Sequence, residues 1–509
     1  MGTALRTAAV AAATGMLAVA CGSTQSTTMT VIGPPVGLEP FYQQKLSWSG
    51  CRDGFQCATL KVPRDYARPE GHQLKISVIR LPARDRSRRV GSLVTNPGGP
   101  GASGVSFLRT SSQAFGAALR DRFDLVGFDP RGVGKSEPVR CFGSRQAEQR
   151  LFADPPATRS QIDTQVMFWR AFVAACRARS GANLPYVGTV NAARDMDVLR
   201  AALGDQRLTY LGFSYGTYLG AFYADQFPRN VRALVLDGAS DPKLTGEEFL
   251  LGHAQGFETA LRAFAAYCVK IAGCPLGAGS VDKAVGKISD LQERAARKPL
   301  RNRAGDHSPV DDDVVTQGIY MALYSRNTWP ALRQALTQAI DDGDGTGLYK
   351  LGDEQEADDS TGALKAVNCV DKPFPADLAA VENLADRAEK VAPHFGSFIV
   401  WPWLPCAYWP VKPTRQPRAV TAAGAPPILV IGTTRDPATP YKWAQSLANQ
   451  LTSGVLLTYD GDGHTAYLAN TEQCIRRPVE EYLINARPPQ RGITCKQQPL
   501  DPDSKGSPG

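Results

Sequence analysis

GFSYG, at residues 212–216, is the stretch that decides the fold, and it matches the pattern Gly-x-Ser-x-Gly. The residues before it, 207–211, form a short, mostly apolar and β-prone run that predicts a buried strand. The residues after it, 217–224, predict a helix packed against a sheet. A serine on a tight turn between strand and helix is held clear of the backbone, beside the unpaired N–H groups that begin the helix. The two glycines leave room where side chains would collide with the neighbouring strand and helix.

This pentapeptide alone does not establish a nucleophile, because a tight turn whose serine caps a helix has the same pattern. A catalytic serine also needs a general base and an acid that orients the base. Asp436 and His464 each follow a predicted strand. Taken singly, Asp436 has the setting of a turn before proline, and His464 that of a surface loop. Together they complete the order Ser, Asp, His that α/β hydrolases use, so we predict Ser214, Asp436 and His464 as a catalytic triad.

A glycine-rich loop, NPGGPGASG at residues 96–104, follows an early predicted strand. We expect Gly98 and Gly99 of this loop, with the N–H of Tyr215, to form the oxyanion region that stabilises developing negative charge. A phosphate-binding loop would end in Gly-Lys-Ser/Thr, which this loop does not, and an ordinary Gly/Pro surface loop is the other alternative. A second loop, DPRGVGKS at residues 129–136, lacks P-loop spacing and predicts a structural turn beside the site.

The order of predicted elements indicates an α/β fold. Two segments of alternating apolar and polar residues, 57–62 and 74–80, predict an antiparallel opening hairpin. Short apolar strands separated by helical stretches have the pattern of a parallel sheet, and they lie at residues 91–95, 124–128, 209–212, 233–236, 428–432 and 455–459. Residues 247–390 have helical periodicity instead, with a break near 327–330. We therefore predict an α/β-hydrolase core with a mostly parallel sheet and an inserted helical cap.

The chain begins with a targeting segment. One positive charge precedes an uncharged run at residues 7–20, which is too short to span a bilayer as a mature helix. Its end resembles a lipobox at Cys21, which would lipidate that cysteine, but Ala18-Val19-Ala20 also matches a signal-peptidase site. We expect an exported protein, either secreted or anchored to the outer face of the membrane or cell wall through Cys21. The predicted segments are a signal peptide at 1–21, a tether at 22–40, core at 41–240, cap at 241–424, core at 425–498 and a disordered tail at 499–509.

Cysteine usage agrees with export. Ten cysteines remain after Cys21, and an even count in an exported chain predicts disulfides. The sequence leaves their connectivity open, and pairing between successive cysteines is the simplest hypothesis. The chain has no Cys-x-x-Cys pair, and no histidines lie near the cysteines as in a metal site, so we expect no metal and no cofactor. The net charge of +8 is scattered, and no aromatic-interleaved basic motif indicates nucleic-acid binding.

Several motifs together resemble the bacterial tripeptidyl aminopeptidases, exported serine peptidases related to proline iminopeptidases. The motifs are the loops at residues 96–101 and 129–136, the pentapeptide at 212–216, AVNCVD at 366–371 and Gly463-His464. The resemblance spans about residues 41–495. It implies the same triad and oxyanion region, and hydrolysis of peptides, or of related amides and small esters, near a free amino end. Such exopeptidases bind the substrate ammonium with an acidic group, for which Glu247, Glu248 and Asp371 are weak candidates.

Two other functions remain open at this stage. A lipase or esterase would use the same triad with a more apolar pocket. The aromatic residues that could bind acyl chains in such a pocket are Trp401, Trp403, Tyr408 and Trp409. Packing inside the cap explains the same aromatic residues without a ligand. A non-catalytic surface protein that kept the fold is the second alternative, and the apparently complete triad argues against it.

Overall fold

The computed structural model describes residues 1–2, 36–141, 155–156, 158–305, 308–353, 360–468 and 473–500. The chain divides into two units, residues 1–33 and residues 34–509, and all helices and strands described below belong to the second. Nearly all of the predicted signal peptide, including Cys21, most of the predicted tether and nearly all of the predicted tail lie outside the described residues. Within the last part of the predicted tether, Leu38 is buried against the core.

One ten-stranded sheet has the order β1-β2-β3-β5-β4-β6-β7-β8-β9-β10. The pairs from β1 to β5 along this order are antiparallel and all later pairs are parallel, which confirms the predicted α/β class. The strands are β1 Ser49–Gly50, β2 Gln56–Pro63, β3 Gln73–Leu81, β4 Gly91–Asn96, β5 Phe123–Phe128, β6 Leu208–Phe213, β7 Val231–Asp237, β8 Ile428–Arg435, β9 Gly454–Asp462 and β10 Thr494–Lys496.

Both faces of the central strands are buried, which is why their sequences are continuous apolar runs rather than alternating ones. Neighbouring residues point into two separate cores: Tyr210 and Leu234 belong to one, Leu211 and Val235 to the other. Helices α6 and α7 cover the first face, and α2, α3 and α17 the second. The helices outside the cap are α1 Glu39–Tyr42, α2 Gly104–Ser111, α3 Ala117–Arg122, α5 Arg159–Ser180, α6 Thr189–Ala202, α7 Tyr215–Gln226, α16 Tyr441–Gln450 and α17 Gln473–Asn485.

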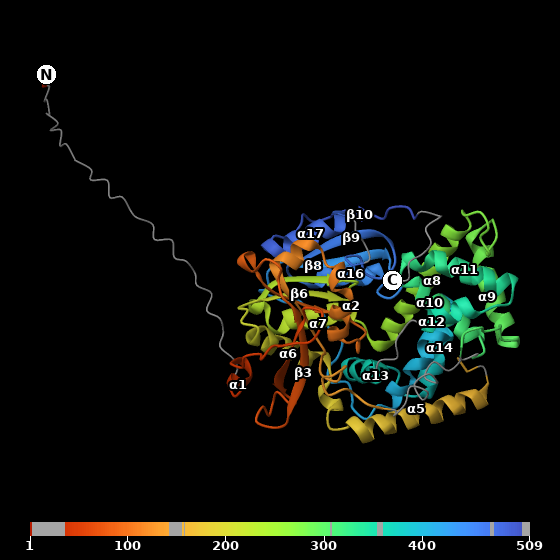
Figure 1. The fold of residues 1–509 in the computed structure, drawn as a ribbon, viewed down its shortest axis with the longest axis horizontal. Coiled ribbons are helices and arrows are strands. Elements are labelled where there is room, and N and C mark those ends of the chain that lie inside the picture. The colour runs from red at the N-terminus through yellow and green to blue at the C-terminus, as the bar shows by residue number, and fades with distance from the viewer. Residues whose placement is uncertain are drawn as a thin grey trace. The chain divides into compact units, whose positions relative to one another are not determined.

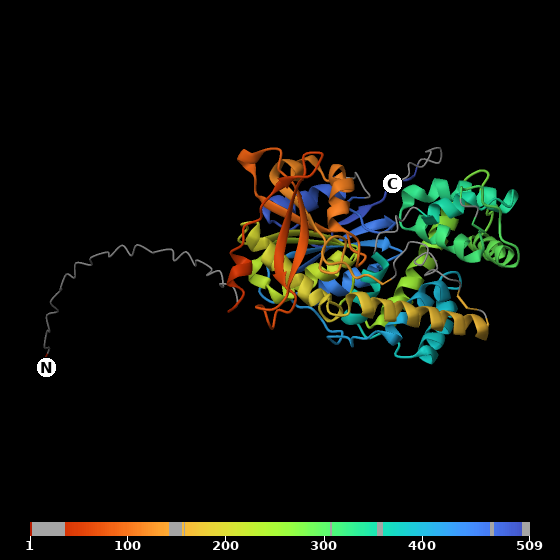
Figure 2. The same cartoon turned by 60° about the horizontal axis from the view of Figure 1, so that its bottom comes forward.

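Between β7 and β8 the described residues form helices and turns but no strand. Figure 1 and Figure 2 show this group, coloured green to teal, gathered beside the sheet. The predicted break near residues 327–330 is present as a short 3₁₀ turn at Arg326–Thr328. The group contains α8 Gly246–Cys268, α9 Val281–Arg297, α10 Asp312–Leu323, α11 Trp329–Asp341, α12 Thr346–Asp353, α13 Ser360–Asp371, α14 Leu378–Val391, α15 Gly396–Val400 and the 3₁₀ helix η7 Trp401–Tyr408.

Five disulfides join successive cysteines, as the simplest hypothesis had it. The pairs are Cys51–Cys57, Cys141–Cys176, Cys268–Cys274, Cys369–Cys406 and Cys474–Cys495. Across the residues that could be searched, no helix has the length and hydropathy needed to cross a membrane.

Candidate active site

The GFSYG stretch forms a strained turn between β6 and α7. Ser214 has a φ of 54° and a ψ of −123°, a conformation that non-glycine residues rarely adopt. A Cβ at Gly212 would lie 2.5 Å from the carbonyl oxygen of Gly216, and a Cβ at Gly216 would lie 2.6 Å from that of Asn96. Both glycines are therefore sterically required. The Ser214 N–H donates to the Asp237 carbonyl at 2.9 Å, which ties the turn to the end of β7.

The predicted oxyanion loop lies directly against this turn. A Cβ at Gly98 would lie 2.6 Å from the Phe213 carbonyl oxygen and 2.8 Å from the Ser214 Cβ, so only glycine permits this approach. Gly98 and Gly99 both have positive φ values, 105° and 100°. Tyr215 begins α7, so its N–H has no acceptor within the helix. The backbone of the Gly98-Gly99 segment and the N–H of Tyr215 therefore both lie next to Ser214.

The loop at residues 129–136 serves a structural purpose beside the site. The Asp129 carboxylate accepts hydrogen bonds from the Ser103 hydroxyl at 2.6 Å and from the Lys135 N–H at 2.9 Å. Arg131 forms an ion pair with Asp195 at 2.5 Å, and both side chains are buried. The loop is thereby fixed both by its own backbone and by contacts with the oxyanion loop and helix α6.

Asp436 and His464 are brought together although 27 residues separate them in the chain. His464 Nδ1 lies 2.9 Å from Asp436 Oδ1, and this carboxylate also accepts from the N–H groups of Ala438 and Thr439, at 2.9 and 2.8 Å. The Thr439 hydroxyl donates to Asp436 Oδ2 at 3.1 Å. The carboxylate is therefore oriented by its own loop before it meets the imidazole.

The environment of His464 favours its charged form. Burial by itself would lower the pKa of the imidazole, but the Asp436 carboxylate, helped by Asp237, raises the pKa above its ordinary value. The His464 Nε2 atom is buried and has no hydrogen-bond partner within the described residues. An imidazole held by a carboxylate at one nitrogen, with the other nitrogen free, has the arrangement of a general base.

A pocket of about 70 Å³ opens beside Ser214. It brings together residues from the loops that follow β4, β6, β7 and β8, from helix α7 and from the cap. The residues that line it are Gly99, Pro100, Ser214, Tyr215, Tyr218, Ser240, Phe249, His253, Tyr324, Asn368, Lys372, Ala438 and Thr439. The cap residue Tyr324 also accepts the backbone N–H of His464 at its carbonyl oxygen, at 2.7 Å. The cap thus contributes both to the wall of the pocket and to the position of the histidine loop.

None of the three candidate ammonium-binding acids lines this pocket. The exposed Glu247 forms an ion pair with Arg387, and Glu248 closes a capping box with Thr245 at the start of α8. Asp371 is buried and accepts from both the backbone N–H and the hydroxyl of Thr189. Thr189 in turn contacts the Tyr215 hydroxyl, so Asp371 supports the residue after Ser214 rather than the pocket itself.

His253, which no sequence motif singles out, also lines the pocket. Its Nδ1 lies 3.0 Å from the Ala438 carbonyl oxygen and its Nε2 lies 3.0 Å from the Tyr320 hydroxyl. Burial lowers the pKa of His253 to about 4, so the ring is neutral and joins the cap to the Asp436 loop. Its position between Phe249 and Phe257 on the apolar face of α8 was the available signal.

The aromatic residues considered for acyl chains pack against the cap. Trp403 stacks on Phe374 with ring centroids 4.9 Å apart, and Trp401 and Trp409 are buried. None of the four lines the pocket beside Ser214. The packing explanation therefore accounts for most of this group.

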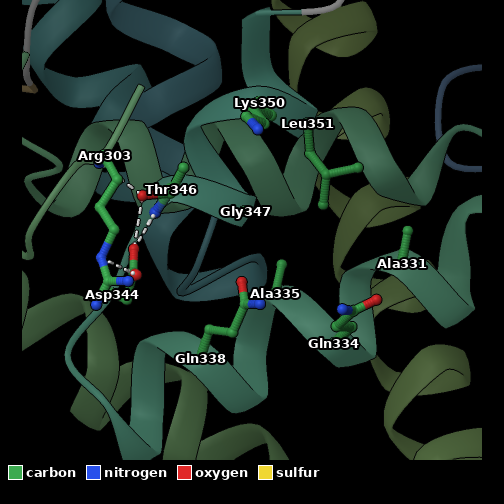
Figure 3. Close-up of a pocket in the computed structure, with 10 residues that line it drawn as sticks. All are labelled: Arg303, Ala331, Gln334, Ala335, Gln338, Asp344, Thr346, Gly347, Lys350 and Leu351. Atoms are coloured by element: carbon green, nitrogen blue, oxygen red, sulfur yellow. Dashed lines mark hydrogen bonds and ion pairs between the residues drawn. The ribbon is translucent and has the colours of Figure 1, made fainter. Parts of the chain in front are cut away.

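A second hollow lies on the cap helices α11 and α12 and has a volume of about 370 Å³ (Figure 3). Two of its charged groups pair with each other, since Arg303 meets Asp344 at 3.0 Å, and the Thr346 hydroxyl also donates to Asp344, at 2.6 Å. None of the predicted site residues lines it.

Comparison with known proteins places these features in a family. The sequence profile described as "TAP-like protein" matches residues 392–495, which include Asp436 and His464. Serine protease Hip1 of Mycobacterium tuberculosis is 41% identical over 488 residues, covering 90% of this chain and 92% of that protein. Carboxylesterase B of the same organism is 38% identical over 481 residues, covering 90% and 91%. Tripeptidyl aminopeptidase of Streptomyces lividans is 33% identical over 474 residues, covering 88% and 86%.

Likeness to solved structures is weaker. The crystal structure of proline iminopeptidase from Mycobacterium smegmatis aligns with 84% of this chain and 98% of its own, at 17% identity and a TM-score of 0.39. Family membership therefore rests on the sequence relatives, which match nearly the full length of both chains. By that measure the chain belongs to the tripeptidyl aminopeptidase-like family of serine hydrolases with the α/β-hydrolase fold.

Proposed function

We propose that the protein hydrolyses peptide bonds through an acyl-enzyme on Ser214. In this mechanism the Ser214 hydroxyl attacks the substrate carbonyl, and His464 Nε2 takes the hydroxyl proton and passes it to the leaving amine. Asp436 keeps the proton on Nδ1 and stabilises the imidazolium that forms. Water then attacks the acyl-enzyme with His464 as base. The observation that carries the proposal is the Asp436–His464 pair, with its free Nε2, beside a pocket that contains Ser214.

The oxyanion of the tetrahedral intermediate would be stabilised by backbone N–H groups of Tyr215 and of the Gly98-Gly99 segment. Support comes from the contact of Gly98 with the Ser214 turn and from the free first N–H of α7. Backbone donors held by such a turn need no reorganisation as charge develops, which is the main source of rate enhancement in acyl transfer.

As to substrate, we propose release of short peptides from the amino end of extended chains. The relative named tripeptidyl aminopeptidase supports this specificity, and a narrow pocket beneath cap residues favours slender substrates over folded proteins. The relative named Carboxylesterase B supports a second candidate, hydrolysis of small esters by the same residues.

We also propose that the protein acts outside the cytoplasm, secreted or anchored through a lipidated Cys21. Five disulfides support export, since such bonds persist in oxidising compartments. The hydrophobic segment before Cys21 supports signal-directed secretion. Metabolic labelling with a fatty acid, compared between the native chain and C21S, tests the anchor.

Replacing Ser214 with alanine tests the nucleophile. The substitution removes only the attacking oxygen, so hydrolysis should fall by about 10⁴-fold or more while the fold persists. Covalent labelling by an organophosphonate should vanish in the same variant. Circular dichroism and the melting temperature serve as controls. Substantial activity in purified S214A would contradict the assignment.

Matched substrates test the specificity. A peptide p-nitroanilide with a free amino end should be cleaved faster than its acetylated twin, because an exopeptidase site holds the substrate ammonium. Faster cleavage of p-nitrophenyl butyrate than of either peptide would favour the esterase. Equal rates on the free and acetylated peptides would indicate an endopeptidase instead.

A further inference from the structure

One charged side chain in the pocket beside Ser214 is not used by the proposed mechanism. Lys372 follows α13, lines the pocket and is only 5% exposed. We propose that Lys372 selects substrates that carry a carboxylate next to the scissile bond. This inference rests on the proposed hydrolysis at Ser214 and assigns the substrate class of that same pocket.

The ammonium group of Lys372 is enclosed by aromatic rings. It lies 4.5 Å from the ring centroid of Tyr218 and 4.7 Å from that of Phe249, and both rings line the pocket. Within the described part of the chain, its ammonium group has these ring contacts but no hydrogen bond and no ion pair. The rings stabilise a cation through their faces, but they cannot replace the hydrogen bonds that the ammonium loses on leaving water.

The charges around Lys372 leave room for an anion. Asp371, the nearest carboxylate, is bound to Thr189, and no carboxylate occurs among the described residues that line the pocket. Arg415, whose charge acts on Lys372, lies over the Phe222 ring at 3.8 Å, and its two terminal nitrogens are buried without a partner in the described residues. Lys372 and Arg415 thus carry two positive charges, whereas the Asp371 carboxylate is already hydrogen-bonded to Thr189.

Titration behaviour agrees with this geometry. Burial lowers the pKa of Lys372 to about 8, although Asp371 opposes the shift. A substrate carboxylate would stabilise the protonated lysine through a charge-assisted hydrogen bond in a site shielded from water. A substrate ammonium at the same place would be repelled.

Two parts of a peptide can supply the carboxylate. An aspartate or glutamate side chain can supply it on the acyl side of the scissile bond. The free terminal carboxylate of a single released amino acid can supply it on the leaving side. Both present the same chemistry to Lys372, so the experiment needs one arm for each.

The acyl arm compares Ala-Ala-Glu p-nitroanilide with Ala-Ala-Gln p-nitroanilide. The leaving arm compares Ala-Ala-Ala-Gly with its carboxamide. We expect the wild-type enzyme to favour the acid in one arm by about 10- to 100-fold in kcat/KM. In K372M, kcat/KM should fall on the acid substrate but not on the amide, so that the preference disappears. K372R, which keeps the positive charge, should retain part of the preference.

Lys365, in helix α13 and seven residues before Lys372, provides a matched control. It too is buried over aromatic rings, 4.1 Å from Trp403 and 5.9 Å from Trp169, but it does not line the pocket. K365M should therefore keep the wild-type preference. Active enzyme is counted in every variant by organophosphonate labelling, so that losses in folded protein are corrected.

Equal wild-type rates on acid and amide in both arms would overturn the role of Lys372, and this comparison decides even where K372M fails to fold. A preference that persists in K372M, or an equal loss on acid and amide, would overturn it too. Failure of the proposed function has a different signature: no substrate would be cleaved and Ser214 would not react with the phosphonate.

Discussion

Asp237 connects the nucleophile turn and the histidine loop without belonging to the proposed triad. Its backbone oxygen accepts the Ser214 N–H, and its carboxylate accepts the N–H groups of Ala466 and Tyr467 at 3.0 and 2.8 Å. Burial raises the pKa of Asp237 to about 6, although these two N–H groups oppose the shift. One residue at the end of β7 thus positions the segments that carry Ser214 and His464.

The pH dependence of hydrolysis should report the Asp436–His464 pair. His464 acts as base only when neutral, and Asp436 raises its pKa, so activity should be lost as the pH falls through a value above the ordinary 6.5. In D436N the burial of the ring is no longer opposed by that charge. The acid limb of kcat/KM should then move to lower pH while the maximum falls roughly 10⁴-fold. An acid limb that stays in place would show that another group titrates.

The end of helix α13 contributes Asn368 to the pocket and leads directly into Lys372, and a disulfide holds this end. Cys369 lies between Asn368 and Lys372 along the chain and bonds to Cys406 in η7. The same helix end reaches back to α6 through Asp371 and Thr189. The position of Lys372 therefore depends on one covalent and one hydrogen-bonded attachment.

Removing this disulfide should destabilise the protein and impair catalysis. The bridge spans 37 residues, and the loss of such a closed loop corresponds to about 4 kcal/mol in the free energy of unfolding. The Cys51–Cys57 bridge spans 6 residues and corresponds to about 2 kcal/mol. Denaturant titration of C369S/C406S against C51S/C57S measures the difference. A fall in kcat/KM should accompany only the first variant, and equal activity in both would contradict a role for α13.

The cap and the sheet are joined through a common interior. Leu250 and Phe257 of α8 belong to the same buried cluster as Leu234 of β7. Tyr324, at the end of α10, holds the histidine loop by its carbonyl oxygen, and His253 reaches the Asp436 loop. The candidate site is therefore formed by both parts, because the cap supplies part of the pocket wall and the turn after β6 supplies Ser214.

Strands β4 to β9 could be predicted to within a few residues, because strands buried on both faces must be continuously apolar. The turn that carries Ser214 could be predicted because only glycine fits at positions 212 and 216, where a Cβ would lie 2.5 and 2.6 Å from backbone oxygens. The disulfide pairing followed from proximity along the chain. The ammonium-binding candidates show what the sequence could not predict, namely the partner of each acidic side chain. Glu247 pairs with Arg387, and Glu248 accepts the backbone N–H of Thr245 at the start of α8.

The sequence by itself determined the α/β class, the turn that carries Ser214 and the chain order of the proposed triad, because these depend on local patterns of apolar residues and glycines. Only the tertiary structure decided which side chains meet at the pocket. Lys372 and Tyr324 have no local signature, and the apolar pattern around His253 does not show which loop it contacts, since these surroundings come from segments far apart in the chain. Burial and charge at such a place are sums over distant neighbours, and those neighbours are defined only once the chain has folded.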